Sequence, residues 1–199
     1  SVITRFAPSP TGNLHIGGVR TALINYIVTQ QAKKKYAKSK FLLRIEDTDK
    51  KRSTKEFKDN IIKGLKWLGI QYDEDPYIQS KRIERHKEIA YKLLNKKMAF
   101  KCICTHETLE KKREENRRNK INIKRLCETC EDDLKIQSLK TGYAIRIKIP
   151  SWGQTTINDL IQGKIIVQSK ELDNFILLRN DGSPTYMLSV VVDDFDMGV

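Results

Sequence analysis

His15 and its neighbours form the first group of residues that can do chemistry. Residues 8–18 are rich in proline, glycine and small polar side chains, and they include His15, Gly17 and Gly18. A helix N-terminus offers free N–H groups and a positive pole to a phosphate, and glycine lets a ligand approach the backbone closely. A histidine donor can follow charge that develops on phosphate. Taken alone, His-x-Gly-Gly more often indicates a turn with a capping histidine, and the P-loop and GxGxxG patterns are absent.

The second group is the full set of cysteines, which forms two tight pairs. The pairs are Cys102 with Cys104 and Cys127 with Cys130. Zinc favours four thiolates in a tetrahedron, and short spacings let one turn supply two ligands. His106 is an alternative ligand, and Cys-x-Cys is less usual than Cys-x-x-Cys. No secretory signal opens the chain, which disfavours disulfides. The spacing therefore predicts a zinc site, with unpaired thiols as the competing interpretation.

Charged residues near the ends of apolar runs form the third group. Arg44, Glu46 and Asp47 close one such run, and without further context they indicate a surface-charged strand end. The last three acidic residues of the sequence are Asp193, Asp194 and Asp196. A metal cluster is conceivable there, but acids of a loop at a strand end are favoured, so they receive no role.

The charge of the chain is large and unevenly distributed. Its 199 residues hold 38 Lys+Arg against 25 Asp+Glu, a net charge of +13. Residues 1–130 carry 31 basic and 15 acidic groups, whereas residues 131–199 carry 7 and 10. One-sided positive charge favours a polyanionic partner, although a solvated lysine-rich surface fits equally well. Residues 107–125 present the same choice between RNA phosphates and a solvated helix with Glu/Lys pairs.

Hydrophobic periodicity places these groups on an alternating set of elements. We expect strands at residues 2–6 and 41–45, and a helix from about Gly17 that ends near residues 33–35. The inward face of this helix is predicted to hold Val19, Ala22, Leu23, Tyr26 and Ile27. A capping box at Ser53 and Glu56 predicts a second helix, which ends at Gly69, and Ser80 is a candidate cap for a third. Strand–helix alternation predicts a parallel α/β sheet.

The pattern changes near residue 99. Short alternating runs predict strands at 144–149, 165–167 and 175–178. Residues 186–194 are expected to form a buried strand that returns to the first sheet, because they contain three consecutive valines. No helix follows it, so we expect a chain cut short. The longest run without charge, residues 6–19, spans 14 residues and contains two prolines, so no membrane-spanning segment is expected.

Taken together, these blocks identify a resemblance. Residues 5–12, 14–18 and 20–23 closely resemble the opening of class I glutamyl-tRNA synthetases. Residues 15–18 correspond to the HIGH signature of that family, with Gly18 in the fourth place. Residues 44–49 with 52–53 resemble its second block, and residues 181–186 with 191–194 resemble a third. The resemblance spans the whole chain in the expected order.

The resemblance implies a fold, a reaction and partners. The fold is an α/β, Rossmann-like parallel sheet with an inserted zinc-bearing α+β acceptor-binding domain. The implied domains are 1–98, the insertion 99–184, and a return at 185–199. The implied reaction joins L-glutamate to tRNA(Glu) through glutamyl-adenylate, with ATP and Mg²⁺ as well as structural Zn²⁺. We expect a monomeric cytoplasmic protein that binds no membrane. The family's KMSKS loop has no counterpart in the chain, so we expect these residues alone to be inactive.

The resemblance also implies roles for individual residues. Arg5 should pair with a substrate carboxylate, and Glu46 should take the α-ammonium group. The implied glutamate pocket is completed by Ala7, Ser9 and Tyr186, the last of which would otherwise be read as ordinary core. ATP should be faced by Thr11, His15, Gly17 and Gly18. The tRNA 3′ end should lie near Thr48, Asp49 and Arg52. The implied zinc ligands are Cys102, Cys104, Cys127 and Cys130, of which Cys130 departs from the family's Cys-x-His pattern.

Two other functions remain open at this point. A glutamyl-Q-tRNA(Asp) synthetase is a shorter paralogue, and the region that distinguishes it lies outside these residues. A non-catalytic zinc-stabilised RNA-binding module would bind an acceptor stem but would have no saturable glutamate site.

Overall fold

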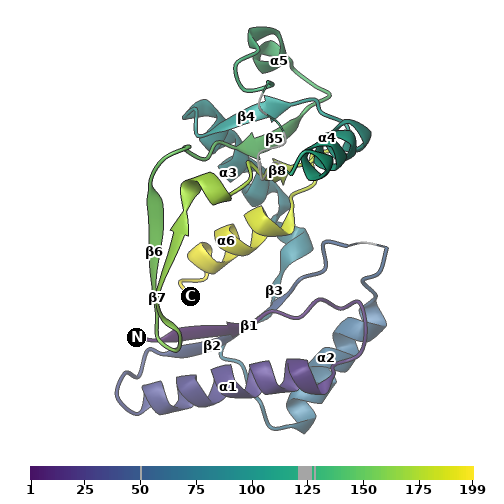
Figure 1. Ribbon diagram of the computed structural model, residues 1–199. Helices are drawn as coiled ribbons and strands as arrows, with labels where there is room; N and C mark the ends of the chain where they lie inside the picture. The colour runs from purple at the N-terminus through teal and green to yellow at the C-terminus, as the bar shows by residue number, and fades with distance from the viewer. Residues whose placement is uncertain (50, 121–126, 128) are drawn as a thin grey trace. The chain divides into compact units, whose positions relative to one another are not determined.

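The computed structural model describes residues 1–49, 51–120, 127 and 129–199, and Figure 1 shows their elements. The chain divides into two compact units, residues 1–84 with 189–199 and residues 85–188. Within the described residues, every helix is too short or too polar to cross a bilayer.

A parallel three-stranded sheet forms the centre of the first unit. Its order is β1 (Ile3–Phe6), β2 (Lys40–Ile45) and β3 (Tyr77–Ile78). β1 pairs with β2 from Ile3 opposite Lys40 to Phe6 opposite Leu43. β2 then pairs with β3 at its last two residues. The predicted strands at 2–6 and 41–45 and their parallel pairing are thus confirmed.

Two helices cover one face of this sheet. α1 (Ile16–Lys33) runs along β1 and β2 (Figure 1), and α2 (Lys55–Trp67) shares its core. The alternate β2 residues Phe41, Leu43 and Ile45 pack with both helices. The prediction that Leu23 and Ile27 face inward is wrong, because they are 42% and 43% exposed. α1 instead buries small side chains, Ala22 and Thr29, which allow a close approach to the sheet.

The two later helices begin differently from the prediction. Thr54, not Ser53, caps α2, and its hydroxyl accepts the Phe57 N–H at 3.2 Å. Gly69, with φ of +72°, ends that helix as expected. α3 (Ile83–Asn95) follows a 3₁₀ turn, η1 (Gln79–Arg82). Ser80 lies inside this turn, so it is not the cap; its N–H and hydroxyl donate to Asp47 at 2.8 and 2.7 Å.

The strand predicted at residues 186–194 is wrong, because these residues belong to helix α6 (Tyr186–Asp196). Leu188, Ser189, Val192 and Asp193 are buried, which is helical spacing, whereas Val191 is 64% exposed. An apolar run does not distinguish a strand from a short buried helix. In the first unit, the C-terminal part of α6 covers the second face of the sheet, where Met197 contacts Arg44.

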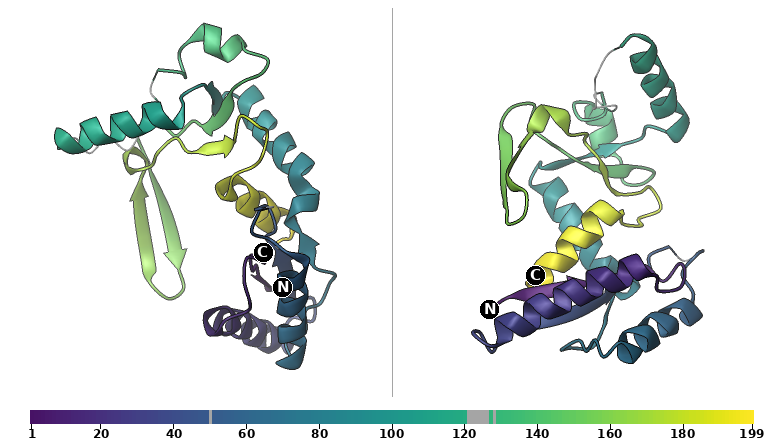
Figure 2. Two further views of the ribbon diagram at one scale, coloured as in Figure 1. Left: turned by 90° about the vertical axis from the view of Figure 1, so that its right-hand side faces the viewer. Right: turned by 60° about the horizontal axis from the view of Figure 1, so that its bottom comes forward.

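The strands of the second unit form two antiparallel sheets. β4 (Ala99–Cys102), β5 (Ala144–Ile147) and β8 (Ile176–Leu178) form an antiparallel sheet in that order. β6 (Gln154–Asp159) and β7 (Gly163–Gln168) form a separate hairpin, which Figure 2 shows side-on. A short turn, η2 (Ser169–Glu171), follows it. The strands predicted at 144–149, 165–167 and 175–178 are confirmed.

Helices α4 (His106–Arg118) and α5 (Leu134–Ser138), together with most of α3, complete this unit. α4 carries most of the charged stretch predicted at 107–125, and residues 121–125 of that stretch lie outside the described residues. Lys111 pairs with Glu107 and Arg118 with Glu114 along the helix. Ion pairs at this spacing are those expected of a solvated helix.

Candidate active site and metal centre

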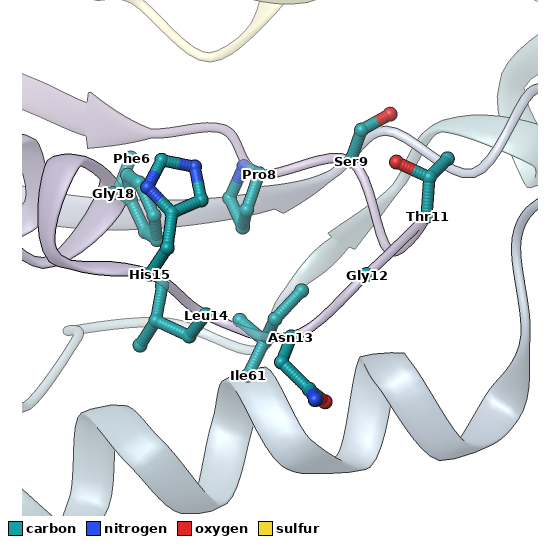
Figure 3. Close-up of a pocket in the computed structure, with 10 residues that line it drawn as sticks. All are labelled: Phe6, Pro8, Ser9, Thr11, Gly12, Asn13, Leu14, His15, Gly18 and Ile61. Atoms are coloured by element: carbon teal, nitrogen blue, oxygen red, sulfur yellow. The ribbon is translucent and has the colours of Figure 1, made fainter.

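A cavity of about 310 Å³ lies where β1 leads into α1. Figure 3 shows its lining, in which the His15 ring and the Ser9 and Thr11 hydroxyls come from the connecting loop. The remaining lining residues are Phe6, Pro8, Gly12, Asn13, Leu14, Gly18 and Ile61. Because the cavity opens at the carboxyl edge of parallel strands and at a helix N-terminus, it suits an anionic ligand.

His15 caps helix α1. Its backbone is extended, with φ of −109° and ψ of 167°, and its Nδ1 accepts the Gly17 N–H at 3.2 Å. Its carbonyl accepts the Val19 N–H at 3.0 Å. Because Nδ1 is the acceptor, the neutral ring carries its proton on Nε2, which is therefore a donor. The capping interpretation and the chemical interpretation of His15 are thus compatible.

The glycines after His15 make room for protein groups. A Cβ on Gly17 would lie 3.0 Å from the His15 ring, and one on Gly18 would lie 3.1 Å from Leu14. A Cβ on Gly64 of α2 would also lie 3.1 Å from Leu14, at its other methyl group. Leu14 therefore packs between α1 and α2 through two glycines. Gly64 was not predicted as part of this arrangement, and only its contact with Leu14 reveals it.

Four charged side chains of alternating sign are connected by hydrogen bonds beside the parallel sheet. Arg5 donates through Nε and Nη2 to the two carboxylate oxygens of Asp194, each at 2.9 Å. Arg44 donates from Nη1 to Asp194 at 2.5 Å, and from Nη2 to Glu46 at 3.0 Å. We call Arg5, Asp194, Arg44 and Glu46 the charge chain. It connects β1, α6, β2 and the segment that follows β2.

Burial makes the charge chain necessary. Arg44 is 0% exposed, so it is not the surface charge that its sequence position indicated. An isolated buried charge is costly, whereas one paired on two sides is tolerated. Burial raises the pKa of Glu46, an effect that Arg44 opposes only in part. Burial also acts to raise the pKa of Asp194, but hydrogen bonds from Arg5 and Arg44 outweigh it and hold that pKa below its usual value.

The remaining predicted site residues of the first unit lie on the cavity loop and on the segment that follows β2. The Ser9 hydroxyl donates to the Glu46 carbonyl at 2.8 Å and so links the cavity loop to the charge chain. Ala7, two residues before Ser9, is partly buried, and Thr48 is exposed. Asp49 accepts from Arg52 Nε at 2.7 Å, which lowers the pKa of Asp49.

Tyr186 belongs to the second unit. It opens α6 and is 60% exposed, so it is not the ordinary core residue that its sequence alone suggested.

The three acids of α6 have arginine partners. Asp193 is 0% exposed, and it accepts from Arg82 Nε at 2.7 Å and from Gln79 at 3.0 Å. Asp196 also pairs with Arg82. The occurrence of three acidic residues in an otherwise apolar segment was the sequence feature that could have indicated arginine partners such as Arg44 and Arg82. The metal cluster that was conceivable there is not formed, since in the described part of the chain only the four cysteines gather as a metal-ligating group.

The four cysteines converge in the second unit. Their Sγ atoms all lie within 4.8 Å of one another. Cys102 lies 3.4 Å from Cys127, and Cys104 lies 3.6 Å from both Cys127 and Cys130. A tetrahedron with Zn–S bonds of about 2.3 Å has sulfur atoms about 3.8 Å apart, so the set fits zinc. His106 is outside the group; its side chain is 88% exposed and faces Glu110.

The surroundings of the cysteines favour thiolate at Cys102 and oppose it at Cys104 and Cys127. The Cys127 thiol, the Cys104 N–H and the Arg146 guanidinium together lower the pKa of Cys102 to about 5. Burial and the Cys102 thiolate raise the pKa of Cys104 to about 11. A divalent cation would relieve this mutual repulsion. Gln137 on α5 donates to the Cys130 carbonyl at 2.6 Å and to the Lys101 carbonyl at 2.9 Å, which ties the two pairs together.

Comparison with known proteins agrees with this geometry. Residues 1–199 match the family model described as tRNA synthetases class I (E and Q), catalytic domain. The chain is 49% identical over 199 residues to glutamate--tRNA ligase 1 of Erythrobacter litoralis, covering all of this chain and 40% of that protein. It is 44% identical over 200 residues to glutamate--tRNA ligase of Thermodesulfovibrio yellowstonii, covering all of this chain and 41% of that protein.

A solved structure agrees as well. The crystal structure of a glutamate tRNA ligase from Elizabethkingia meningosepticum, in complex with its amino acid, superimposes with a TM-score of 0.84 at 34% identity. The match covers all of this chain and 42% of that one. The family match over the full chain, together with the parallel sheet and its HIGH-type loop, supports one assignment. The chain belongs to the class I tRNA synthetases for glutamate and glutamine, of which it represents catalytic-domain sequence.

Proposed function

We propose that this chain belongs to an enzyme that joins L-glutamate to tRNA(Glu) through glutamyl-adenylate. The observation that carries the proposal is the charge chain, which presents Arg5 at one end and Glu46 at the other. Ser9 joins it to the cavity at the start of α1. Site, family and relatives therefore support the same chemistry, while the chain spans 40% of the length of the first relative.

Glutamate carries two carboxylates and one ammonium group, and the charge chain can recognise both signs. Arg5 is a planar cation suited to a carboxylate, and Glu46 is an anion suited to the ammonium group. Ala7 and Ser9 are proposed to complete the pocket on the first unit, whereas the role of Tyr186, which belongs to the second unit, stays a prediction from the resemblance. Burial raises the pKa of Glu46, so a bound ammonium would favour its ionised form.

The cavity at the start of α1 is proposed to receive ATP. The positive pole of the helix, the Thr11 hydroxyl and Gly18 face this space, and His15 Nε2 supplies a donor. Gly17, which is not among the lining residues, would act by holding His15 through its N–H. The glutamate α-carboxylate would attack the α-phosphate, and pyrophosphate would leave. Positive donors are needed because both reactants are anionic. ATP would enter with Mg²⁺, which neutralises phosphate charge when bound.

The acceptor end of the tRNA is proposed to contact two regions. Thr48, Asp49 and Arg52 follow β2 and would lie near the terminal adenosine, whose ribose hydroxyl takes the glutamyl group. The insertion proposed at 99–184 would hold the acceptor stem. Its four cysteines would hold zinc in a structural role, because four thiolates leave no open coordination position.

Glutamate-dependent ATP–pyrophosphate exchange tests the proposal. The protein that carries this chain is assayed with tRNA(Glu), and glutamine and aspartate serve as competitor amino acids. We expect exchange with glutamate and transfer of labelled glutamate to tRNA(Glu). Arg5→Met should abolish both. The matched control is Arg85→Met, because Arg85 lies outside the charge chain and pairs with Glu88 along α3, and it should retain activity.

Three outcomes would count against the proposal. Labelling of tRNA(Asp) in place of tRNA(Glu) would favour the paralogue that glutamylates a modified base. RNA binding without saturable glutamate binding would favour a non-catalytic RNA-binding module. Full activity of the Arg5→Met protein would remove the charge chain from the glutamate site.

A further inference from the structure

Asp194 is the point where two cationic side chains meet. Its two carboxylate oxygens accept hydrogen bonds from Arg5 Nε and Nη2, each at 2.9 Å. Oδ1 also accepts a hydrogen bond from Arg44 Nη1 at 2.5 Å. A bidentate pair fixes the plane of a guanidinium as well as its position. The orientation of Arg5 is therefore set from α6 and not only by its own strand.

Arg44 extends this control to Glu46. Its side chain is 0% exposed, and its Nε and Nη2 atoms both donate to Oε1 of Glu46, at 3.2 and 3.0 Å. A buried guanidinium needs compensation on both sides. If Asp194 lost its charge, Arg44 would keep one carboxylate only, and two cations would face each other. Both ends of the charge chain thus depend on one carboxylate.

We propose that Asp194 is a positioning residue for the glutamate site. It holds Arg5 directly and Glu46 through Arg44, so that the groups for a substrate carboxylate and for the ammonium keep a defined separation. This inference rests on the proposed function, because it takes Arg5 and Glu46 as the groups that bind glutamate. Asp194 itself needs no contact with substrate to act in this way.

The neighbouring acids of α6 provide a contrast. Asp193 and Asp196 both pair with Arg82, which lies in the 3₁₀ turn before α3. They link α6 to this turn, whereas Asp194 links α6 to Arg5 and Arg44. Asp196→Asn is therefore a matched control for Asp194→Asn, since each removes one negative charge from the same helix.

The test is the steady-state kinetics of glutamate-dependent pyrophosphate exchange in the protein that carries this chain. Displacement of a positioned group can cost up to about a hundredfold. We expect Asp194→Asn to raise KM for glutamate by about tenfold or more and to change KM for ATP by less than about twofold. Asp196→Asn should leave both within about twofold. Asp194→Glu keeps the charge but shifts the carboxylate by one methylene, so it should raise KM for glutamate at an unchanged melting temperature.

A double-mutant cycle separates positioning from general damage. In an Arg5→Lys background the bidentate pair is already lost, so Asp194→Asn can act only through Arg44 and Glu46, and it should raise KM for glutamate by less than it does in the wild type. Additive effects, equal rises of the two KM values, or a wild-type KM in Asp194→Asn would overturn the inference. If Asp194→Asn does not fold, Asp194→Glu decides by the same criteria. Failure of the unmodified protein to activate glutamate would instead reject the proposed function.

Discussion

His15 offers a perturbation that separates helix capping from chemistry. Its Nδ1 caps α1 by accepting the Gly17 N–H at 3.2 Å, and the ring lines the cavity. His15→Ala removes both the cap and the ring. His15→Asn removes the ring but retains a good capping group, because asparagine is among the preferred N-cap residues. The two variants therefore differ in stability but agree in what they remove from the cavity.

The expected magnitudes follow from these contacts. Loss of an N-cap costs about 1 kcal/mol, which lowers the melting temperature by about 4–8 °C for a unit of about 60–100 residues. We expect that loss for His15→Ala and a change of only a few tenths of a kcal/mol for His15→Asn. Loss of a donor that acts on transition-state charge costs about 10²–10³ in kcat. Both variants should show it, with KM for glutamate changed far less.

The assay combines thermal unfolding with pyrophosphate exchange in the presence of tRNA(Glu). Wild-type kcat in His15→Asn would refute the chemical role and leave His15 as a cap. Equal melting temperatures for the two variants would refute the cap. A rise in KM for glutamate without a fall in kcat would assign His15 to substrate binding.

Three further predictions concern the metal centre, the core and acid stability. Metal analysis of the purified protein should find about one zinc per chain, and Cys102→Ser should lose it; absence of metal in the wild type would return the cysteines to free thiols. Leu65→Ala should cost about 2–5 kcal/mol in urea unfolding, because Leu65 is 0% exposed, whereas Leu68→Ala, at 39% exposure, should cost far less. Burial acts to raise the pKa of Asp73, but hydrogen bonds from Lys33 and a backbone N–H hold it below the ordinary value. The stabilisation that ionised Asp73 contributes is therefore present above the ordinary aspartate pKa and is lost as pH falls through the lowered pKa. Asp73→Asn should make the free energy of unfolding depend less on pH in the acid range. An unchanged pH dependence would contradict the assignment.

Local patterns predicted the elements of the first unit well. The apolar runs at 2–6 and 41–45 became β1 and β2, and Gly69 ended α2 in the left-handed conformation. The failures came where two structures satisfy one pattern. Three consecutive valines fit a central strand and a buried helix equally, and only the packing of Leu188 and Val192 decides for α6.

The candidate site was predictable in its parts but not in its connections. The blocks around His15 and around Arg44 were visible as motifs, and so were the four cysteines. The charge chain was not visible, because Arg44 and Asp194 lie 150 residues apart in the sequence. A charged residue that ends an apolar strand is usually exposed, and nothing local indicates that a distant helix will bury it. The pairing depends on tertiary structure alone.

The alternation of β2 connects the core to the proposed site. Phe41, Leu43 and Ile45 point to α1 and α2, so Arg44 must point to the opposite face, where Asp194 lies. A shift by one residue would exchange the two faces. It would move Arg44 into an apolar core and expose the three large side chains to a charged surface. The same hydrophobic burial that holds the sheet therefore also fixes which face carries the charge chain, and a stable core and a correctly aimed Arg44 are one requirement on this strand.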